Sequence, residues 1–222
     1  MAKRKKKGNV ILFSAHSDDQ VVGAGGTMMK LKADSYQIYN VVMSSGEKSH
    51  PWIKAEYIVK LREDEATEAG SLLGCKKTIF LHLQENKFLE NKEAMLMEMK
   101  SLIEELKPVK IYTHIQDDPH PDHSATNKLV LEAVNKLEDQ KLKDELHIYA
   151  FDVWNPLNLR GRDLPRVYID ISEYFDKKIN IFKMFRSQKA AIFTLLWSLY
   201  LRAIVHGNHI GARYAERFYK IK

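Results

Sequence analysis

The stretch VILFSAHSDD (residues 10–19) places an apolar run directly before a histidine and two adjacent aspartates. A short, continuous apolar run is typical of a strand that is buried on both faces. Asp18 and Asp19 repel each other at the end of such a strand, and both require water or a cation. The stretch therefore predicts a buried strand that delivers charged side chains to a site.

Apolar runs of strand length recur along the chain and alternate with segments of helical spacing. The expected strands cover residues 10–15, 37–43, 78–83, 110–115, 147–153 and 167–171. The expected helices cover residues 26–32, 54–73, 91–106 and 122–137. This alternation predicts an α/β fold with a mostly parallel sheet and helices on both faces. After Asp170 we expect a mostly helical, aromatic-rich C-terminal portion that packs across the sheet or over a pocket.

A short basic segment carries most of the net charge. Residues 3–7 supply five of the 35 Lys and Arg residues, and the remaining 30 nearly balance the 29 Asp and Glu residues. We expect residues 1–8 to be a flexible basic tail and residues 9–222 to form a single α/β domain. No specific nucleic-acid partner is expected. A weak electrostatic contact of the tail with RNA or a membrane is the alternative.

Two features bear on where the protein works. The single cysteine, Cys75, excludes an internal disulfide and fits a reducing compartment. The best candidate for a membrane span, residues 190–205, is interrupted by Ser198 and Arg202 and falls short of the roughly 20 residues required. The basic N-terminus lacks the apolar region of a secretory signal. We expect a cytoplasmic protein without a transmembrane segment.

Three polar loops follow expected strands. Residues 15–19 (AHSDD) come after the first strand, residues 44–50 (SSGEKSH) after the second, and residues 116–123 (QDDPHPDH) after the fourth. Ligands of open α/β sheets bind beyond the carboxyl ends of the strands, where these loops meet. The loops therefore predict one site, to which two of them bring histidines and paired aspartates.

A divalent metal would account for His16, Asp19 and His123 together. Two imidazoles and one carboxylate leave coordination positions open for water and substrate, as in catalytic zinc sites. The cation would also offset the repulsion between Asp18 and Asp19. Asp18 could then take a proton from water bound to the metal.

The motif HPDH (residues 120–123) suggests different roles for its two histidines. We expect the Asp122 carboxylate to orient His120, because carboxylates commonly orient ligand or catalytic histidines. An oriented His120 could stabilise an oxyanion and donate a proton to a leaving amine. The alternative for both loops is structural, since Asp18, Asp19 or Asp122 could simply cap the helix that follows.

The glycine-rich segment GAGG (residues 23–26) does not fit a dinucleotide-binding loop, because that pattern needs a glycine where Met28 stands. The preceding aspartates would also repel a pyrophosphate. We expect these glycines to let the backbone approach the metal loop and the neighbouring strand closely.

In combination, these motifs resemble those of the PIG-L/LmbE-like N-acetylglucosaminyl deacetylases. The family's A-H-P-D-D motif is read here as residues 15–19, with Ser17 in place of proline, and VVGAGGTMMK (21–30) follows it. The family's H-P-D-H motif is matched in full at 120–123. Gln20 stands where an acidic residue is common, so one charge near the site is lost. The segments that agree with weaker motifs are LREDEATEAGSLLG (61–74), FRSQ (185–188) and GARYAERF (211–218).

The resemblance implies a Rossmann-like α/β fold, a Zn²⁺ ion and an N-deacetylase. The substrate would be a small molecule or glycoconjugate that contains N-acetylglucosamine. The implied zinc ligands are His16, Asp19 and His123, and the implied general base is Asp18. His120, oriented by Asp122, would polarise the transition state.

Arg62 and Glu47 are the candidates for substrate binding. Arg62 could grip a hydroxyl, carboxylate or phosphate group of the substrate. It could equally be an exposed helix arginine that pairs with Glu63 or Glu65. Glu47 lies in the loop after the second strand, which should face the site.

Two other functions stay open. Another metal-dependent hydrolase, such as a phosphoesterase, would usually need two metals and more bridging carboxylates than the sequence offers. A non-catalytic carbohydrate-binding protein would have no need of Asp18 beside a metal ligand.

The segment 192–205 is apolar and aromatic. Its apolar residues at helical spacing are Ile192, Leu195, Leu196, Leu199 and Ala203, with Trp197 and Tyr200 to one side. Burial in the core and a subunit interface are both compatible with this stripe. We expect a homo-oligomer, which the family resemblance also favours.

Overall fold

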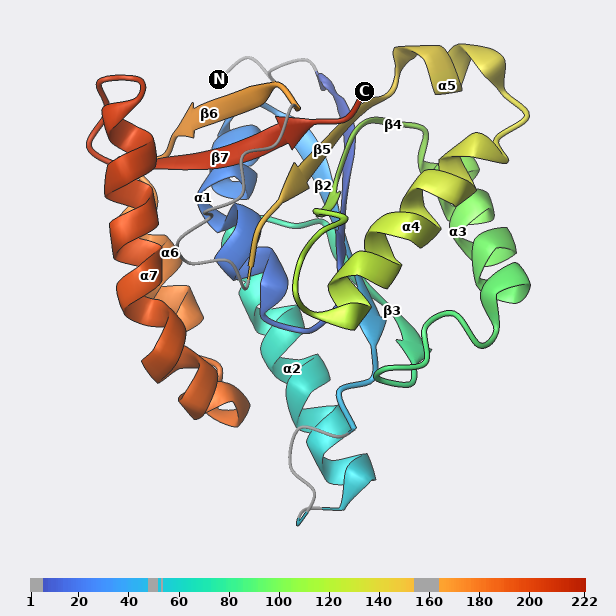
Figure 1. Cartoon of the computed structure of the whole chain (residues 1–222), viewed down its shortest axis with the longest axis horizontal. Coiled ribbons are helices and arrows are strands. Elements are labelled where there is room, and N and C mark those ends of the chain that lie inside the picture. The colour runs from blue at the N-terminus through green and yellow to red at the C-terminus, as the bar shows by residue number, and fades with distance from the viewer. Residues whose placement is uncertain (1–5, 48–51, 53, 154–163) are drawn as a thin grey trace.

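Seven strands form one sheet among the residues that the computed structural model describes, which are 6–47, 52, 54–153 and 164–222 (Figure 1). The strands are β1 (Gly8–Ser14), β2 (Tyr36–Ser44), β3 (Lys77–Leu83), β4 (Pro108–His114), β5 (His147–Phe151), β6 (Arg166–Asp170) and β7 (Ala215–Lys220). Their order is β3-β2-β1-β4-β5-β7-β6. Strands β1 to β5 pair in parallel, whereas β7 runs antiparallel to both β5 and β6. The predicted α/β fold with a mostly parallel sheet is confirmed.

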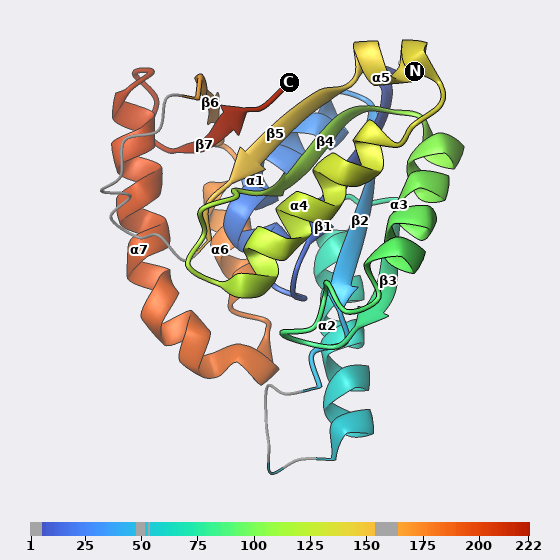
Figure 2. The same cartoon turned by 45° about the vertical axis from the view of Figure 1, so that its right-hand side comes forward.

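Helices cover both faces of this sheet (Figures 1 and 2). They are α1 (Asp19–Ala33), α2 (Ala55–Leu73), α3 (Lys92–Leu106), α4 (Pro121–Asn135), α5 (Gln140–Glu145), α6 (Phe175–Phe182) and α7 (Lys189–Asn208), with a 3₁₀ turn at Arg186–Gln188. Val10 and Leu12 of β1 join the core that includes α1, α6 and α7. Ile11 and Phe13 join the core formed with α3 and α4. Because alternate residues of β1 are buried on opposite faces, the whole strand is apolar.

Helix α1 begins at Asp19, well before the predicted start at residue 26. The glycines that were expected to approach the metal loop lie inside this helix. A Cβ atom on Gly23 would come within 2.1 Å of the Phe151 ring, and one on Gly26 within 2.7 Å of Ile171. The glycines therefore let α1 pack closely against side chains at the ends of β5 and β6. Glycine is a poor helix former, which is why the sequence pattern concealed this first part of α1.

The mostly helical C-terminal portion is confirmed for α6, the 3₁₀ turn and α7, but the prediction omitted strand β7. Three of the six residues of β7 are charged, namely Glu216, Arg217 and Lys220, so the strand lacks an apolar run. It nevertheless lies between β5 and β6 and joins β6 to the rest of the sheet.

The N-terminal segment joins the sheet earlier than the predicted domain boundary. Strand β1 starts at Gly8, and the main-chain N–H of Lys7 donates to the Ser35 carbonyl over 3.2 Å. Residues 1–5 of the predicted basic tail lie outside the described residues. Within the described part of the chain, every helix is too short or too polar to cross a membrane.

Candidate metal centre

The candidate site lies where the chain leaves β1 and β4. These strands are parallel neighbours, so their carboxyl ends lie side by side. His16 lies in the β1–α1 loop, and Asp19 is the first residue of α1. His120 caps α4, and His123 lies in the first turn of that helix. The fold thus brings together residues that are 107 positions apart in the sequence.

The three predicted ligands place one donor atom each at the corners of a nearly equilateral triangle. Asp19 Oδ2 is 3.4 Å from His16 Nδ1 and 3.4 Å from His123 Nε2. The two imidazole nitrogens are 3.3 Å apart. Tetrahedral zinc with bonds of about 2.0–2.1 Å to nitrogen and oxygen separates neighbouring donors by about 3.3–3.4 Å. The residues present therefore fit a zinc ion.

Two overlapping groups also gather donor atoms: His16 with His120 and His123, and Asp19 with His114 and His123. In the second group, Nε2 of His114 accepts the main-chain N–H of Ala15 over 2.9 Å, so its lone pair is already engaged. In the first group, Nδ1 of His120 accepts the main-chain N–H of Asp122 over 3.2 Å. We take the triangle of predicted ligands as the candidate metal site.

A carboxylate lies beside the other ring nitrogen of both histidines of the triangle. Asp118 Oδ1 lies 3.0 Å from His123 Nδ1, and Asp122 Oδ2 lies 3.3 Å from His16 Nε2. The Asp122 carboxylate also accepts the main-chain N–H of Asn86. Carboxylates in this position orient the imidazole that binds a metal and make it more basic.

The partners of the Asp122 and Asp118 carboxylates differ from those predicted from the sequence. The Asp122 carboxylate was assigned to His120 but turns to His16, and His120 instead receives the main-chain N–H of Asp122. Asp118 was not assigned a role, although it stands in the same QDDPHPDH loop. The second aspartate of that loop was the available signal, but its partner depends on how the loop folds back.

Electrostatic effects favour positive charge at the centre. Burial lowers the pKa of His123, but Asp19 and Asp118 outweigh it and raise the pKa to about 10. Burial likewise lowers the pKa of His16, and hydrogen bonds with Asp122 and Asp19 raise it to about 8. Burial raises the pKa of Asp19, yet the charge on His123 brings it well below its ordinary value. A metal ion among the donors would supply the same positive charge without protonated histidines.

Asp18, the neighbour of Asp19 in the chain, lies close to Arg62. Burial and the charge of Asp19 raise the pKa of Asp18, whereas Arg62 opposes this shift. The Arg62 guanidinium is 3.8 Å from Asp18 Oδ1 and 4.0 Å from Glu85, and its Nε donates to Ser17 Oγ over 3.0 Å. Arg62 is buried, so it is not an exposed helix arginine.

His120 and Glu47 lie nearer the surface, and both are half-buried. The ring centroid of His120 is 4.7 Å from those of both His16 and His123. Burial and the charges on these two histidines lower the pKa of His120 to about 4. Glu47 accepts the main-chain N–H of Glu85 over 3.1 Å, and Glu85 in turn lies 4.0 Å from Arg62.

The segment that holds both loops matches a known protein family. Residues 11–134 match the family described as PIG-L, GlcNAc-PI de-N-acetylase, and this segment is more than half of the chain. The chain belongs to the PIG-L family. The resemblance that the AHSDD and HPDH motifs predicted is thereby confirmed, since this member carries both motifs inside the matched segment.

Three similar proteins show the range of names among relatives of this PIG-L member. A probable N-acetyl-α-D-glucosaminyl L-malate deacetylase 2 of Bacillus cereus is 25% identical over 83% of this chain and 85% of its own. A 4-oxalmesaconate hydratase of Pseudomonas putida is 26% identical over 87% of this chain and 77% of its own. The solved structure of N,N'-diacetylchitobiose deacetylase from Pyrococcus horikoshii is 24% identical, with a TM-score of 0.79 over 96% of this chain and 83% of that one. This last likeness shows a shared fold.

Proposed function

We propose that this PIG-L family member is a zinc-dependent hydrolase that removes the N-acetyl group from an N-acetylglucosamine-containing small molecule or glycoconjugate. The observation that carries the proposal is the donor triangle of His16, Asp19 and His123, whose edges of 3.3–3.4 Å suit zinc. A further carboxylate, Asp18, lies beside the triangle. The family's name and the deacetylase named among its relatives support the substrate class.

The residues around the triangle have complementary tasks in this reaction. A bound zinc ion would polarise the acetyl carbonyl and lower the pKa of water. Asp18 would accept the proton of the attacking water, a role that suits a carboxyl group whose pKa is raised by burial and by Asp19. His120, whose lowered pKa keeps the ring neutral, would donate an N–H hydrogen bond to the developing oxyanion, and the proton that Asp18 takes from water would pass to the leaving amine. Asp118 and Asp122 would hold the ligand imidazoles in place.

We propose that Arg62 and Glu47 bind the substrate. The Arg62 guanidinium is 3.8 Å from Asp18, so a substrate oxygen close to the general base also comes within reach of this arginine. Glu47 is linked to the same region through Glu85, which contacts both residues. These contacts would favour hydroxyl groups of a sugar.

Hydration of a carbon–carbon double bond is the second candidate, because the 26% identical relative from Pseudomonas putida is named a 4-oxalmesaconate hydratase. That reaction also needs activated water and a proton donor, but it breaks no amide. A phosphoesterase and a non-catalytic carbohydrate-binding protein are further alternatives that the same experiment can distinguish.

The test is a substrate screen with zinc-loaded and chelator-treated protein. N-acetylglucosamine, N,N'-diacetylchitobiose and a glucosaminyl malate conjugate would be assayed for free amine and acetate in equal amounts. 4-Oxalmesaconate and p-nitrophenyl phosphate would be assayed in parallel. We expect zinc-dependent amine release from at least one amino sugar. Hydration of 4-oxalmesaconate, phosphate release, or sugar binding without any product would each replace the proposal with the corresponding alternative.

We also propose that the chain is a homo-oligomer, although the predicted stripe has a different role. Leu195, Leu199 and Ala203 of that stripe pack into the core. The opposite side of α7 exposes Phe193 (86%) and Trp197 (54%), together with Leu201, Ile204 and Val205. An exposed apolar surface of this kind is typical of a protein interface, and a second copy of the chain is the proposed partner.

A cytoplasmic location belongs to the same proposal. It rests on the single cysteine, Cys75, whose thiol has no second cysteine to pair with in the chain. Fractionation of the native host, with a cytoplasmic enzyme as marker, would test it.

A further inference from the structure

Lys178 and Glu216 form a buried ion pair away from the metal centre. Lys178 lies in α6 and Glu216 in β7, and Lys178 Nζ is 2.7 Å from Glu216 Oε1 with both side chains at most 5% exposed. Burial lowers the pKa of the Lys178 ammonium group, and Glu216 counteracts this. A buried ion pair is often no more stabilising than a packed apolar pair of the same volume. The other groups that this pair binds therefore suggest its role.

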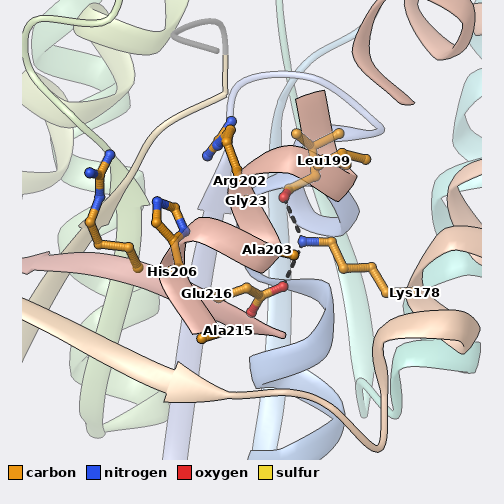
Figure 3. Close-up of a pocket in the computed structure, with 10 residues that line it drawn as sticks. Gly23, Lys178, Leu199, Arg202, Ala203, His206, Ala215 and Glu216 are labelled. Atoms are coloured by element: carbon orange, nitrogen blue, oxygen red, sulfur yellow. Dashed lines mark hydrogen bonds and ion pairs between the residues drawn. The ribbon is translucent and has the colours of Figure 1, made fainter. Parts of the chain in front are cut away.

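The pair, which Figure 3 shows with a dashed line between Lys178 and Glu216, binds three main-chain groups of α1. Lys178 Nζ donates to the Val22 carbonyl over 2.9 Å, and Glu216 Oε1 accepts the Gly26 N–H over 2.9 Å. Glu216 Oε2 accepts the Thr27 N–H over 2.8 Å. The Val22 carbonyl and the Gly26 N–H are the partners that a regular α-helix would join directly. The ion pair thus binds α1 at this step of the helix and fixes it to α6 and β7.

The bridged segment leads directly to the aspartates of the candidate metal centre. The main-chain N–H groups of Val21 and Val22 both donate to the Asp18 carbonyl, over 3.0 and 3.2 Å. Gly23, the next residue, packs so closely on Phe151 that even a Cβ atom would not fit. The first turn of α1 is therefore joined to Val22 by main-chain hydrogen bonds.

The remaining ligand, His123, belongs to α4 on the opposite face of the sheet. The donor triangle therefore depends on the position of α1 relative to α4. Its edges of 3.3–3.4 Å would change if one helix shifted relative to the other. A displacement of about 1 Å in a catalytic site can cost on the order of 100-fold in rate.

We propose that Lys178 and Glu216 are positioning residues that hold the first turn of α1, and with it Asp18 and Asp19, in register with His123. The catalytic consequence of this inference rests on the proposed deacetylase function. The consequence for metal binding depends only on the donor triangle.

The test compares the variants Glu216→Gln and Lys178→Met with the control Phe218→Leu. The amide nitrogen of Gln cannot accept an N–H from α1, and Met cannot donate to the Val22 carbonyl. Phe218 is a buried neighbour of Glu216 on β7, so its truncation lowers stability without removing the pair. For each variant, zinc affinity is measured by chelator competition, and amide hydrogen exchange is followed across residues 19–27. The kcat and KM values for the best amino-sugar substrate complete the comparison.

We expect both variants to bind zinc about 10- to 100-fold more weakly, as when other supports of metal ligands are removed. Exchange should become faster across residues 19–23, and kcat should fall while KM changes less than about twofold. The control should unfold at a lower temperature with unchanged zinc affinity. Wild-type zinc affinity in folded variants, or an equal loss in the control, would overturn the inference.

Two further results keep the test decisive. If Glu216→Gln does not fold, Glu216→Asp retains the charge but shortens the side chain, and it should change zinc affinity and exchange in the same direction. Unchanged values in Glu216→Asp would then overturn the inference. If the wild type binds zinc but deacetylates no amino sugar, the proposed function fails, and zinc affinity and exchange still decide the role of the pair.

Discussion

Asp18 and Asp19 are neighbours in the sequence, yet their surroundings shift their pKa values in opposite directions. Burial and the charge of Asp19 raise the pKa of Asp18. His123 lowers the pKa of Asp19 despite its burial. A metal ligand must be ionised, and a general base must be able to hold a proton, so these opposite shifts suit the proposed roles of Asp19 as ligand and Asp18 as base.

Asp18→Asn tests this division. The amide cannot accept a proton, so we expect turnover to fall by about 100- to 10,000-fold while bound zinc stays near one ion per chain. Kinetics and metal analysis on the same samples measure both quantities. Asp34→Asn, an exposed change at the other end of α1, is the control. Near-normal turnover in Asp18→Asn would transfer the role of base to another group.

Asp118→Ala tests the support of a ligand. Removal of the carboxylate that lies 3.0 Å from His123 Nδ1 should weaken zinc binding by about 10- to 100-fold. Chelator competition measures the change. Asp117→Ala removes the exposed aspartate next to it in the same loop and should retain wild-type affinity. Equal losses in the two variants would indicate a general effect on the loop.

At the scale of elements, helix α1 combines a poor helical sequence with tight packing. Gly23, Gly25 and Gly26 follow within its first two turns and have different surroundings. A Cβ atom on Gly23 would meet Phe151 at 2.1 Å, whereas one on Gly25 would meet its nearest neighbour, Cγ of Lys178, only at 3.3 Å. Close packing of α1 therefore requires glycine at Gly23, whereas Gly25 leaves more room.

This difference predicts opposite effects of two alanine substitutions. Gly23→Ala should lower the free energy of unfolding by about 1–3 kcal/mol, because Phe151 is buried and must move. Gly25→Ala should be neutral or stabilise by up to about 1 kcal/mol, since alanine favours the helix. Denaturant unfolding of both variants beside the wild type measures the changes. A Gly23→Ala variant as stable as the wild type would show that the helix can shift away from β5.

For the whole molecule, the candidate metal joins helices from both faces of the sheet. Zinc that binds only the folded chain should stabilise it by about 2.7 kcal/mol when its free concentration is 100-fold above Kd. We expect about one zinc per chain, and a chelator should lower the unfolding temperature and abolish turnover until zinc is restored. His123→Ala should lose both the bound zinc and its stabilising effect. Unchanged metal content in this variant would remove His123 from the site.

The exposed side of α7 leads to a prediction for assembly. Light scattering at low micromolar concentration should give a mass that is a multiple of the 25.8 kDa chain. Phe193→Ser with Trp197→Ser changes two exposed side chains and should shift the mass toward one chain without loss of fold. A wild-type mass of 25.8 kDa would show that this surface has another role.

The sequence by itself determined the parallel part of the sheet and the candidate ligands. The strand β1 is readable because burial on both faces leaves an uninterrupted apolar run. His16 and Asp19 are readable because they lie three residues apart in one loop, and the HPDH motif contains His123. Local spacing of this kind indicates a strand or a candidate ligand pair without knowledge of the fold.

Only the tertiary structure decided which groups support the ligands and how the C-terminal portion completes the sheet. Asp118 faces His123, Asp122 faces His16 instead of the predicted His120, and Glu216 meets Gly26 across 190 positions of sequence. The charged strand β7 becomes a strand because β5 and β6 pair with it on both sides. The physical reason is that a single polar pair between distant elements leaves no periodicity in the sequence. Its partner is set by the packing of helices and strands, which local spacing cannot specify.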